Sequence, residues 1–229
     1  MSHFHQRSES SAQTPETNGN VLHKALSYDV LSNLVLRPSQ ASILTLAQIK
    51  LGDKVLDVGC GSGRLVIAVQ KKLGPSGAAQ GIDPAPEMIA VARKNAARAG
   101  QAAKFEIGVI EAIPFPDATF DVVLSRLMMH HLPGDLKQRG LAEIRRVLKP
   151  GGVCLIVDFE PPKAHILYHM SEHLLNHAMA QVNIREYIPL LTGAGFIEVE
   201  TGPTSSRLLS FVRGRSPRSA QPPESPPSL

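Results

Sequence analysis

The sequence contains Val55-Leu56-Asp57-Val58-Gly59-Cys60-Gly61-Ser62-Gly63, an apolar strand pattern that runs into three glycines at alternate positions. A helical pattern follows directly, so the glycines lie in a turn between a strand and a helix. A side chain in such a turn would collide with a ligand lying across it, and glycine tolerates backbone angles that other residues resist. We therefore predict that the main chain of this turn contacts a bound ligand.

A carboxylate ends the next predicted strand. Asp83 comes 20 residues after Gly63, where a carboxylate can accept hydrogen bonds from the 2′- and 3′-hydroxyls of a ribose. The glycine spacing departs from the dinucleotide fingerprint G-x-G-x-x-G/A, because Arg64 occupies its sixth position. Asp57 would repel a phosphate but attract the amino group of a methionine moiety. These residues predict an adenosine-containing cofactor and disfavour a pyrophosphate.

Strand-like runs alternate with helical ones along the chain, which is the pattern of a parallel sheet covered by helices on both faces. The predicted strands are 54–58, 78–82, 104–108, 121–125, 152–159, 196–201 and 208–212. The predicted helices are 21–36, 39–49, 62–73, 86–99, 136–148, 164–181 and a short one opened by Asn183. We expect one α/β domain over 21–213, with cap helices at 21–49, a lid-like helix at 164–181, and disordered tails at 1–20 and 214–229.

The composition is that of a globular protein, with 43% hydrophobic and 19% charged residues. The net charge of +4 is modest, and part of it comes from Arg213, Arg215 and Arg218. Aromatic residues make up only 4%. We therefore expect no nucleic-acid partner. No stretch approaches the roughly 20 apolar residues of a membrane span, and the N-terminus shows no secretory signal. Cys60 and Cys154 form neither a disulfide framework nor a zinc pattern, so we expect a cytoplasmic protein.

Five segments in order resemble those of class I S-adenosylmethionine-dependent methyltransferases. The stretch from Asp57 to Gly63 is similar to motif I of that family, and Gly81-Ile82-Asp83 is similar to its ribose-binding segment. The other three resemble the ubiquinone/menaquinone-biosynthesis type; they are 111–117 with 120–123, 148–152 and 194–196. The resemblance spans residues 51 to 196. It implies a Rossmann-like, mostly parallel seven-stranded sheet of order 3-2-1-4-5-7-6, and S-adenosyl-L-methionine as the cofactor.

The same resemblance implies a set of cofactor-binding residues. The set is Tyr28, Asp57, Gly59, Cys60, Gly61, Gly63, Asp83, Pro84, Met88, Val109, Ile110, Glu111, Ser125 and Arg126. For Tyr28 the alternative to cofactor binding is that it is a residue on the surface of a helix. Val109 replaces an Asp that accepts the adenine amino group in many relatives, and losing one neutral hydrogen bond costs about 0.5–1.5 kcal/mol. We expect the main chain at Val109 and Ile110 to hold the adenine instead.

Candidate bases follow the fourth predicted strand, at the sheet edge where open α/β folds bind ligands. Methyl transfer is an in-line displacement, in which positioning supplies about 7–11 kcal/mol, so a base is needed only if the acceptor must lose a proton. The candidates are Ser125, Arg126, Met129, His130 and His131. His131 resembles the second His of a His-His-Leu segment in relatives with unrelated substrates. That resemblance favours a structural or cofactor-side role for His131 over a catalytic one.

Four histidines recur every four residues in the helix predicted after the fifth strand: His165, His169, His173 and His177. At about 100° per residue they form one column at the edge of the apolar face. Three interpretations stay open. The histidines bridge core and solvent, or one or two of them, with His165 and His169 as candidates, face the pocket as base or orienter. The third is a shared metal ion, but no acidic ligand is fixed by the spacing, and no metal site is predicted.

The motifs together predict a methyltransferase that methylates O or C of a small, fairly apolar metabolite of the quinone-precursor, phenol or enol type. An RNA or protein methyltransferase is the first alternative, and weak basicity and few aromatic residues disfavour it. A protein that binds the cofactor without methyl transfer is the second, with Val109 as its only support in the sequence. The sequence pattern encodes neither the oligomeric state nor the identity of the acceptor.

Overall fold

The computed structural model describes residues 40–160, 183–206 and 208–218 of the 229-residue chain. Two predicted helices, 21–36 and 164–181, lie outside these residues. So do the expected tail at 1–20 and most of the one at 214–229. No helix in the described ranges is long and apolar enough to cross a membrane.

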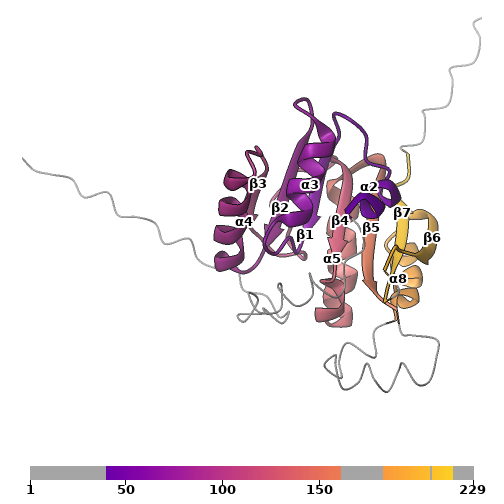
Figure 1. Ribbon diagram of the computed structural model, residues 1–229. Coiled ribbons are helices and arrows are strands. Elements are labelled where there is room, and N and C mark those ends of the chain that lie inside the picture. Colours follow the sequence, from indigo (N-terminus) through magenta and orange to yellow (C-terminus); the bar gives the residue numbers. More distant parts are fainter. Residues whose placement is uncertain (1–39, 161–182, 207, 219–229) are drawn as a thin grey trace, which may run out of the picture.

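The core of the domain is a seven-stranded sheet of order β3-β2-β1-β4-β5-β7-β6, shown in Figure 1. Its strands are β1 (Lys54–Val58), β2 (Ala78–Asp83), β3 (Lys104–Ile107), β4 (Phe120–Arg126), β5 (Leu148–Phe159), β6 (Ile197–Pro203) and β7 (Leu209–Arg215). The first five strands pair in parallel, whereas β7 runs antiparallel to both β5 and β6. The predicted fold class and strand order are confirmed.

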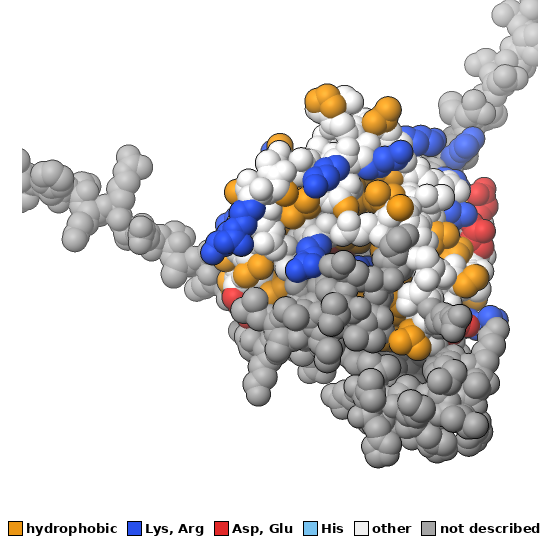
Figure 2. All heavy atoms as spheres, in the orientation of Figure 1, with side chains coloured by type: hydrophobic (Ala, Val, Ile, Leu, Met, Phe, Trp, Pro, Cys, Tyr) orange, Lys and Arg blue, Asp and Glu red, His pale blue; other side chains and the backbone are white. Residues whose placement is uncertain are grey.

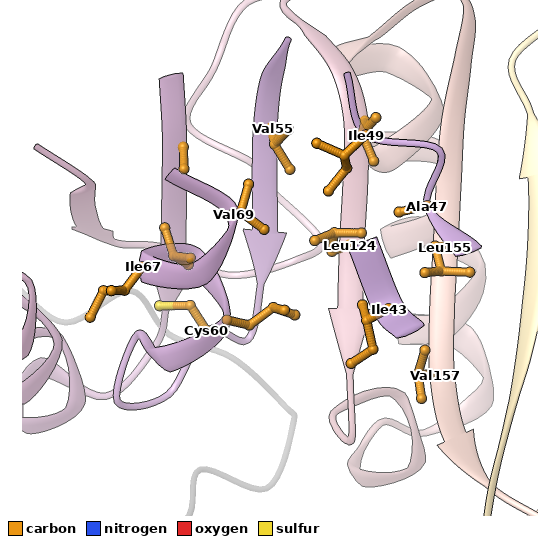
Figure 3. Close-up of a cluster of buried hydrophobic side chains, with 14 of the residues drawn as sticks. Ile43, Ala47, Ile49, Val55, Cys60, Ile67, Val69, Leu124, Leu155 and Val157 are labelled. Carbon is orange, nitrogen blue, oxygen red and sulfur yellow. The ribbon is translucent and has the colours of Figure 1, made fainter. Parts of the chain in front are cut away.

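Helices cover both faces of the sheet. The helices are α2 (Gln40–Leu46), α3 (Arg64–Leu73), α4 (Pro86–Arg98), α5 (Gly134–Val147) and α8 (Tyr187–Gly193), with short 3₁₀ turns η1 (Met129–His131) and η2 (Ile184–Glu186). Buried residues of α2, α3 and α4 form one cluster with one face of the sheet, and those of α5 and α8 form a second cluster with the other. In Figure 3, Ile43 of α2 and Ala47, which directly follows that helix, lie over Leu124 and Leu155 of the central strands.

The parallel register brings the carboxyl ends of four strands to one edge of the sheet. Asp57 of β1 pairs with Gly81 of β2 on one side and with Leu124 of β4 on the other. Arg126, at the end of β4, pairs with Val157 of β5. Loops that leave these strands therefore start side by side, and this is the edge at which open α/β sheets bind ligands.

The observed boundaries differ from the predicted ones at the glycine turn and in the last strand. Helix α3 begins at Arg64 instead of residue 62, because Gly61 and Gly63 have φ angles of 51° and 76°, outside the right-handed helical region. Strand β7 continues to Arg215, whereas the predicted strand ends at 212 and the predicted domain at 213. The residue after β7, Ser216, is also bonded to the start of β5. Gly151 N donates to Ser216 O (3.0 Å), and Ser216 N donates to Gly152 O (2.9 Å).

Gly63→Ala is expected to destabilise the protein more than Gly100→Ala. Both glycines have left-handed φ angles, 76° and 61°, which cost an alanine about 1–2 kcal/mol. A Cβ on Gly63 would also lie 2.7 Å from the Phe105 ring and 2.8 Å from the Ala92 Cβ, while one on Gly100 has no neighbour within 4 Å. The clash should add about 1–3 kcal/mol. Urea unfolding measures both losses, and equal losses would contradict the packing argument.

Candidate functional site

The glycine loop after β1 is bonded to the end of β2. The main-chain N–H groups of Gly59 and Cys60 both donate to the carbonyl oxygen of Ile82, each at 2.9 Å. The N–H of Gly61 donates to Oδ2 of Asp83 at 2.9 Å. These three bonds fix the path of the loop across the sheet edge before any ligand binds.

The structure gives a further reason for two of the three glycines. A Cβ on Gly59 would lie 2.4 Å from Cγ of Met128, and one on Gly63 would lie 2.7 Å from the Phe105 ring. At these positions the side chains of the protein itself, rather than a ligand, exclude a Cβ. At Gly61 the nearest atom is Cε of Met88, at 3.6 Å, which is an ordinary contact. Room for a ligand is therefore an argument for Gly61 alone.

Asp57 places a buried carboxylate directly beneath this loop. Its side chain is 3% exposed, and its Oδ1 atom has no hydrogen-bond partner among the described residues. Burial raises the pKa of Asp57 from 3.8 to about 7; the Arg126 guanidinium opposes this shift and the Asp83 carboxylate adds to it. A buried oxygen without a partner is uncommon in folded proteins and marks a place where a ligand can donate a hydrogen bond.

Asp83 stabilises the loop in addition to its predicted role of binding a ribose. Its Oδ2 accepts from Gly61 N, and its Oδ1 accepts from Ala85 N at 3.0 Å, so the carboxylate joins the loop to the start of α4. Burial is the main cause that raises the pKa of Asp83, Glu87 adds to the rise, and these two main-chain bonds oppose it. A carboxylate offers about four lone-pair sites. Two sites are therefore left for ribose hydroxyls.

The Cys60 thiol is not a reactive nucleophile. The side chain is 8% exposed, and burial raises its pKa well above the usual value of 9.0, with the nearby Asp57 and Asp83 carboxylates adding to the rise. A thiol that stays protonated is a poor nucleophile. Cys60 contributes its main-chain N–H to the loop, and Gly81 leaves room for it, since a Cβ there would lie 2.8 Å from Sγ.

The segment after β3 presents main chain rather than side chains to the site. Val109 is buried, and its carbonyl oxygen accepts from Ala112 N at 3.3 Å. The Ile110 side chain packs towards α5, where its Cγ1 lies 2.6 Å from a Cβ built on Gly140. Any contact between Ile110 and a ligand must therefore come from its main chain. Arg146 of α5 holds the following turn by donating to the carbonyl oxygens of Ile113 (2.9 Å) and Phe115 (2.8 Å).

The end of β4 adds a hydroxyl and a cation to the same edge. Ser125 is 2% exposed, and its Oγ has no hydrogen-bond partner in the described ranges. Arg126 is close enough to Asp57 to lower the pKa of that carboxyl. Leu127 follows with φ 54°, a left-handed conformation that few non-glycine residues adopt and that is found preferentially at functional sites.

The two histidines of η1 differ in their surroundings. Burial lowers the pKa of His131 to about 4, the neighbouring His130 adds to the shift, and Asp158 opposes it. The side chain of His130 is 3% exposed, and its Nδ1 lies 2.7 Å from Oδ1 of Asp158. Our sequence reasoning chose His131 and missed Asp158. A signal for Asp158 was present, since a lone acidic residue in the apolar run Val153-Cys154-Leu155-Ile156-Val157-Asp158-Phe159 needs a buried partner.

The structure brings most of the predicted cofactor residues to one edge and leaves others undescribed. The loop glycines, Asp57, Asp83, Met88, Ser125 and Arg126 come from β1, β2, α4 and β4. Tyr28, His165, His169, His173 and His177 lie outside the described residues. Their assignments stay predictions.

The described residues fit an aminoacyl nucleoside. Asp57 supplies a buried acceptor for an ammonium group, and Asp83 supplies acceptors for ribose hydroxyls. The carboxylates and the loop offer no cation directed at a phosphate group, apart from Arg126, whose charge acts on Asp57. The donor set therefore agrees with S-adenosylmethionine better than with a dinucleotide.

Comparison with known proteins gives the same class. Residues 55–152 match the family model described as a methyltransferase domain. The chain is 37% identical over 117 residues to the ubiquinone/menaquinone biosynthesis C-methyltransferase UbiE of Geobacter sulfurreducens, a match that covers 50% of this chain and 45% of that protein. It is 36% identical over 139 residues to the UbiE of Bordetella avium, covering 59% and 54%. The chain thus spans about half the length of these relatives.

A solved structure agrees on the fold. The crystal structure of a SAM-dependent methyltransferase from Aquifex aeolicus superposes with a TM-score of 0.69 at 23% identity, covering 84% of this chain and 97% of that one. The sheet order and the glycine loop agree with the match of residues 55–152 to a methyltransferase domain, a class of enzyme that uses S-adenosylmethionine. The UbiE proteins are thus among the proteins that this chain is similar to, and they are of the type that its sequence motifs resemble.

Asp57→Asn is expected to gain stability relative to the wild type as pH rises from 5 to 8. The raised pKa of about 7 means that the folded wild type holds a proton that the unfolded chain releases near 3.8. Wild-type stability therefore falls as pH rises through this window, by about 2–3 kcal/mol, and an amide does not titrate. Urea unfolding of the ligand-free proteins at both pH values measures the difference. A difference that is constant with pH would contradict the assignment.

Proposed function

We propose that this protein transfers the methyl group of S-adenosylmethionine to O or C of a small, fairly apolar metabolite of the quinone-precursor, phenol or enol type. One observation carries the proposal. A buried carboxylate oxygen of Asp57, without a partner among residues 40–160, 183–206 and 208–218, lies under a main-chain loop whose neighbour, Asp83, has lone pairs not used by Gly61 and Ala85. This arrangement matches the ammonium group and the sugar of that cofactor.

The residues of the chain then have separate tasks. Bound S-adenosylmethionine would supply a methyl group on a positively charged sulfur. Asp57 would hold the ammonium group, Asp83 the ribose, and the main chain at Val109 and Ile110 the adenine. Ser125 and Arg126 would line the side from which the acceptor approaches. Positioning of this kind is sufficient for much of the rate enhancement of an in-line displacement.

The relatives support a small acceptor. The printed names of the UbiE proteins describe C-methylation in ubiquinone and menaquinone biosynthesis. We extend to this chain only the chemical class, a hydroxylated ring or enol. Two free, buried cysteines, Cys60 and Cys154, fit a reducing compartment such as the cytoplasm.

The surface charges favour a small acceptor over a nucleic acid. Figure 2 shows Lys and Arg side chains spread over several elements of one face, with acidic side chains gathered at the β6 side. On β7, Arg213 pairs with Glu200, and Arg215 lies 3.1 Å from Glu198, so both cations are neutralised within the sheet edge. Dispersed and paired cations make a weak footprint for phosphates.

Asp83→Asn is expected to weaken binding of S-adenosylhomocysteine by about 10- to 100-fold, because hydrogen bonds to a charged group contribute about 1.5–3 kcal/mol. Isothermal titration calorimetry measures the dissociation constant. The amide keeps one acceptor oxygen for the main chain, so the variant is chosen over Asp83→Ala, which would leave the N–H groups of Gly61 and Ala85 unbonded.

Glu106→Gln is the matched control. Glu106 is an exposed carboxylate on β3, in register with Ile82 one residue before Asp83, and its loss should leave binding unchanged. Equal affinity in Asp83→Asn and wild type would refute the placement of the ribose. Failure of the wild type to bind either S-adenosylmethionine or S-adenosylhomocysteine would refute the proposed function.

A further inference from the structure

A fully buried carboxylate near the end of β5 joins three elements. Asp158 is 0% exposed. Its Oδ1 accepts from the main-chain N–H of Phe159 at 2.9 Å and lies 2.7 Å from Nδ1 of His130. Its Oδ2 accepts from the main-chain N–H of His130 and from the hydroxyl of Tyr187, both at 3.1 Å. Strand β5, η1 and α8 thus meet at one side chain.

These contacts determine where His130 carries its proton. The two main-chain N–H groups are obligatory donors, one to each oxygen, so both oxygens of Asp158 act as acceptors. Burial raises the pKa of Tyr187, and Asp158 adds to the rise, so the phenol stays protonated and donates as well. Nδ1 of His130 must therefore donate. In a neutral imidazole the other nitrogen, Nε2, then holds a free lone pair.

The second ring nitrogen of His130, Nε2, is enclosed by the protein. The side chain of His130 is 3% exposed, and Nε2 is buried without a hydrogen bond in the part of the chain that the structure describes. The two ring nitrogens point in different directions, so Nε2 is directed away from Asp158. A buried polar atom left without a partner calls for an explanation, and a ligand that donates a hydrogen bond would supply one.

The pair lies at the ligand-binding edge of the sheet. Asp158 directly follows the residue of β5 that pairs with the end of β4. Met128 packs against the cofactor loop, since its Cγ would lie 2.4 Å from a Cβ on Gly59. His130 is only two residues further along the chain, and the N–H of His131 donates back to Met128 O at 3.0 Å. The imidazole is therefore attached directly to the segment that touches the loop.

We propose that His130 Nε2 is the general base that removes the hydroxyl proton of the methyl acceptor, and that Asp158 is the positioning residue that holds the imidazole. The inference rests on the proposed function and narrows it. The acceptor class becomes compounds with an acidic O–H group: phenols, hydroquinones and enols.

The step balances without a further reactant. The acceptor oxygen, or the ring or enol carbon conjugated with it, donates an electron pair to the methyl carbon as the carbon–sulfur bond breaks. The hydroxyl proton passes to Nε2, and sulfur leaves with the bonding pair as neutral S-adenosylhomocysteine. The positive charge that was on sulfur is thereby transferred to the imidazolium, where the Asp158 carboxylate balances it.

The neighbouring titratable groups leave this role to His130. The His131 ring lies 3.9 Å from that of His130, and its pKa, lowered to about 4, makes it a weak base. Tyr187 donates to Asp158, and Lys137 of α5 lies behind it, with Nζ 5.4 Å from the centre of the Tyr187 ring. Phe159 closes a further side of the imidazole, with ring centres 5.2 Å apart.

The first test needs no ligand. Long-range ¹H–¹⁵N spectra of histidine-labelled protein report the tautomer of each of the nine histidines, and the His130→Asn variant identifies the signal of His130 by its loss. We expect the neutral form protonated at Nδ1. Protonation at Nε2 in the neutral ring would overturn the assignment of the base.

The second test uses 4-nitrophenol, whose ionised form is coloured, with S-adenosylhomocysteine bound to the protein. At a pH where the free phenol is mainly un-ionised, wild type should increase the coloured form, and His130→Asn and Asp158→Asn should not. His130→Asn should also lower kcat for methyl transfer to this phenol by about 10²–10⁴-fold. It should leave the dissociation constant of S-adenosylhomocysteine within about twofold.

Asp121→Asn controls for loss of a carboxylate elsewhere in the same sheet. Asp121 lies at the opposite end of β4, where it accepts from Lys149 Nζ at 2.7 Å, so its loss should leave phenol ionisation unchanged. His130→Gln replaces the asparagine variant if that one fails to fold. An unchanged coloured fraction or kcat in a folded His130 variant, or no ionisation by wild type, would overturn the proposal. Absence of cofactor binding would instead refute the proposed function. The tautomer measurement would still show which ring nitrogen of His130 carries the proton.

Discussion

The hydrogen bonds from the loop after β1 to the end of β2 constrain everything else at this edge of the sheet. Gly59 and Cys60 share the carbonyl of Ile82, and Gly61 is bonded to Asp83. Because the strand ends are in register, these bonds hold two carboxylates and a main-chain turn in fixed relative positions. A binding surface made of main chain does not lose side-chain rotamer entropy on binding, so the fold itself supplies the preorganisation.

The acidic side chains at the two ends of the sheet differ in how far they are buried. At the amino end, Asp121 and Lys149 form a partly exposed ion pair, and such pairs contribute little to stability in either direction. At the carboxyl end, Asp57 and Asp158 are buried. Asp158 accepts from four neighbouring groups, whereas one oxygen of Asp57 has no partner in the part of the chain that the structure describes and so costs stability in the ligand-free state. A site that is destabilising without its ligand and satisfied with it is common in enzymes.

The strands and the cofactor edge could be predicted from local sequence patterns, whereas the order of the strands was implied by the resemblance to class I methyltransferases. Buried parallel strands are continuous apolar runs, and Asp57 and Asp83 end two of them. The packing behind the glycines could not be predicted, since Phe105 and Met128 reach Gly63 and Gly59 from distant parts of the chain. The pairing of an imidazole with a carboxylate 28 residues away was missed for the same reason, because it depends on the β4–β5 register.

The position of β7 between β5 and β6 means that strands emerge during synthesis in a different order from their places in the sheet. β6 leaves the ribosome before β7, so for a time it has no neighbour to pair with. An unpaired strand is open to pairing with other chains. Its residues are well suited to this delay, since Glu198 and Glu200 place negative charge along it and Pro203 ends it without an N–H group. A shift in register next to Glu200 interrupts it further, so nascent β6 is a poor template for aggregation.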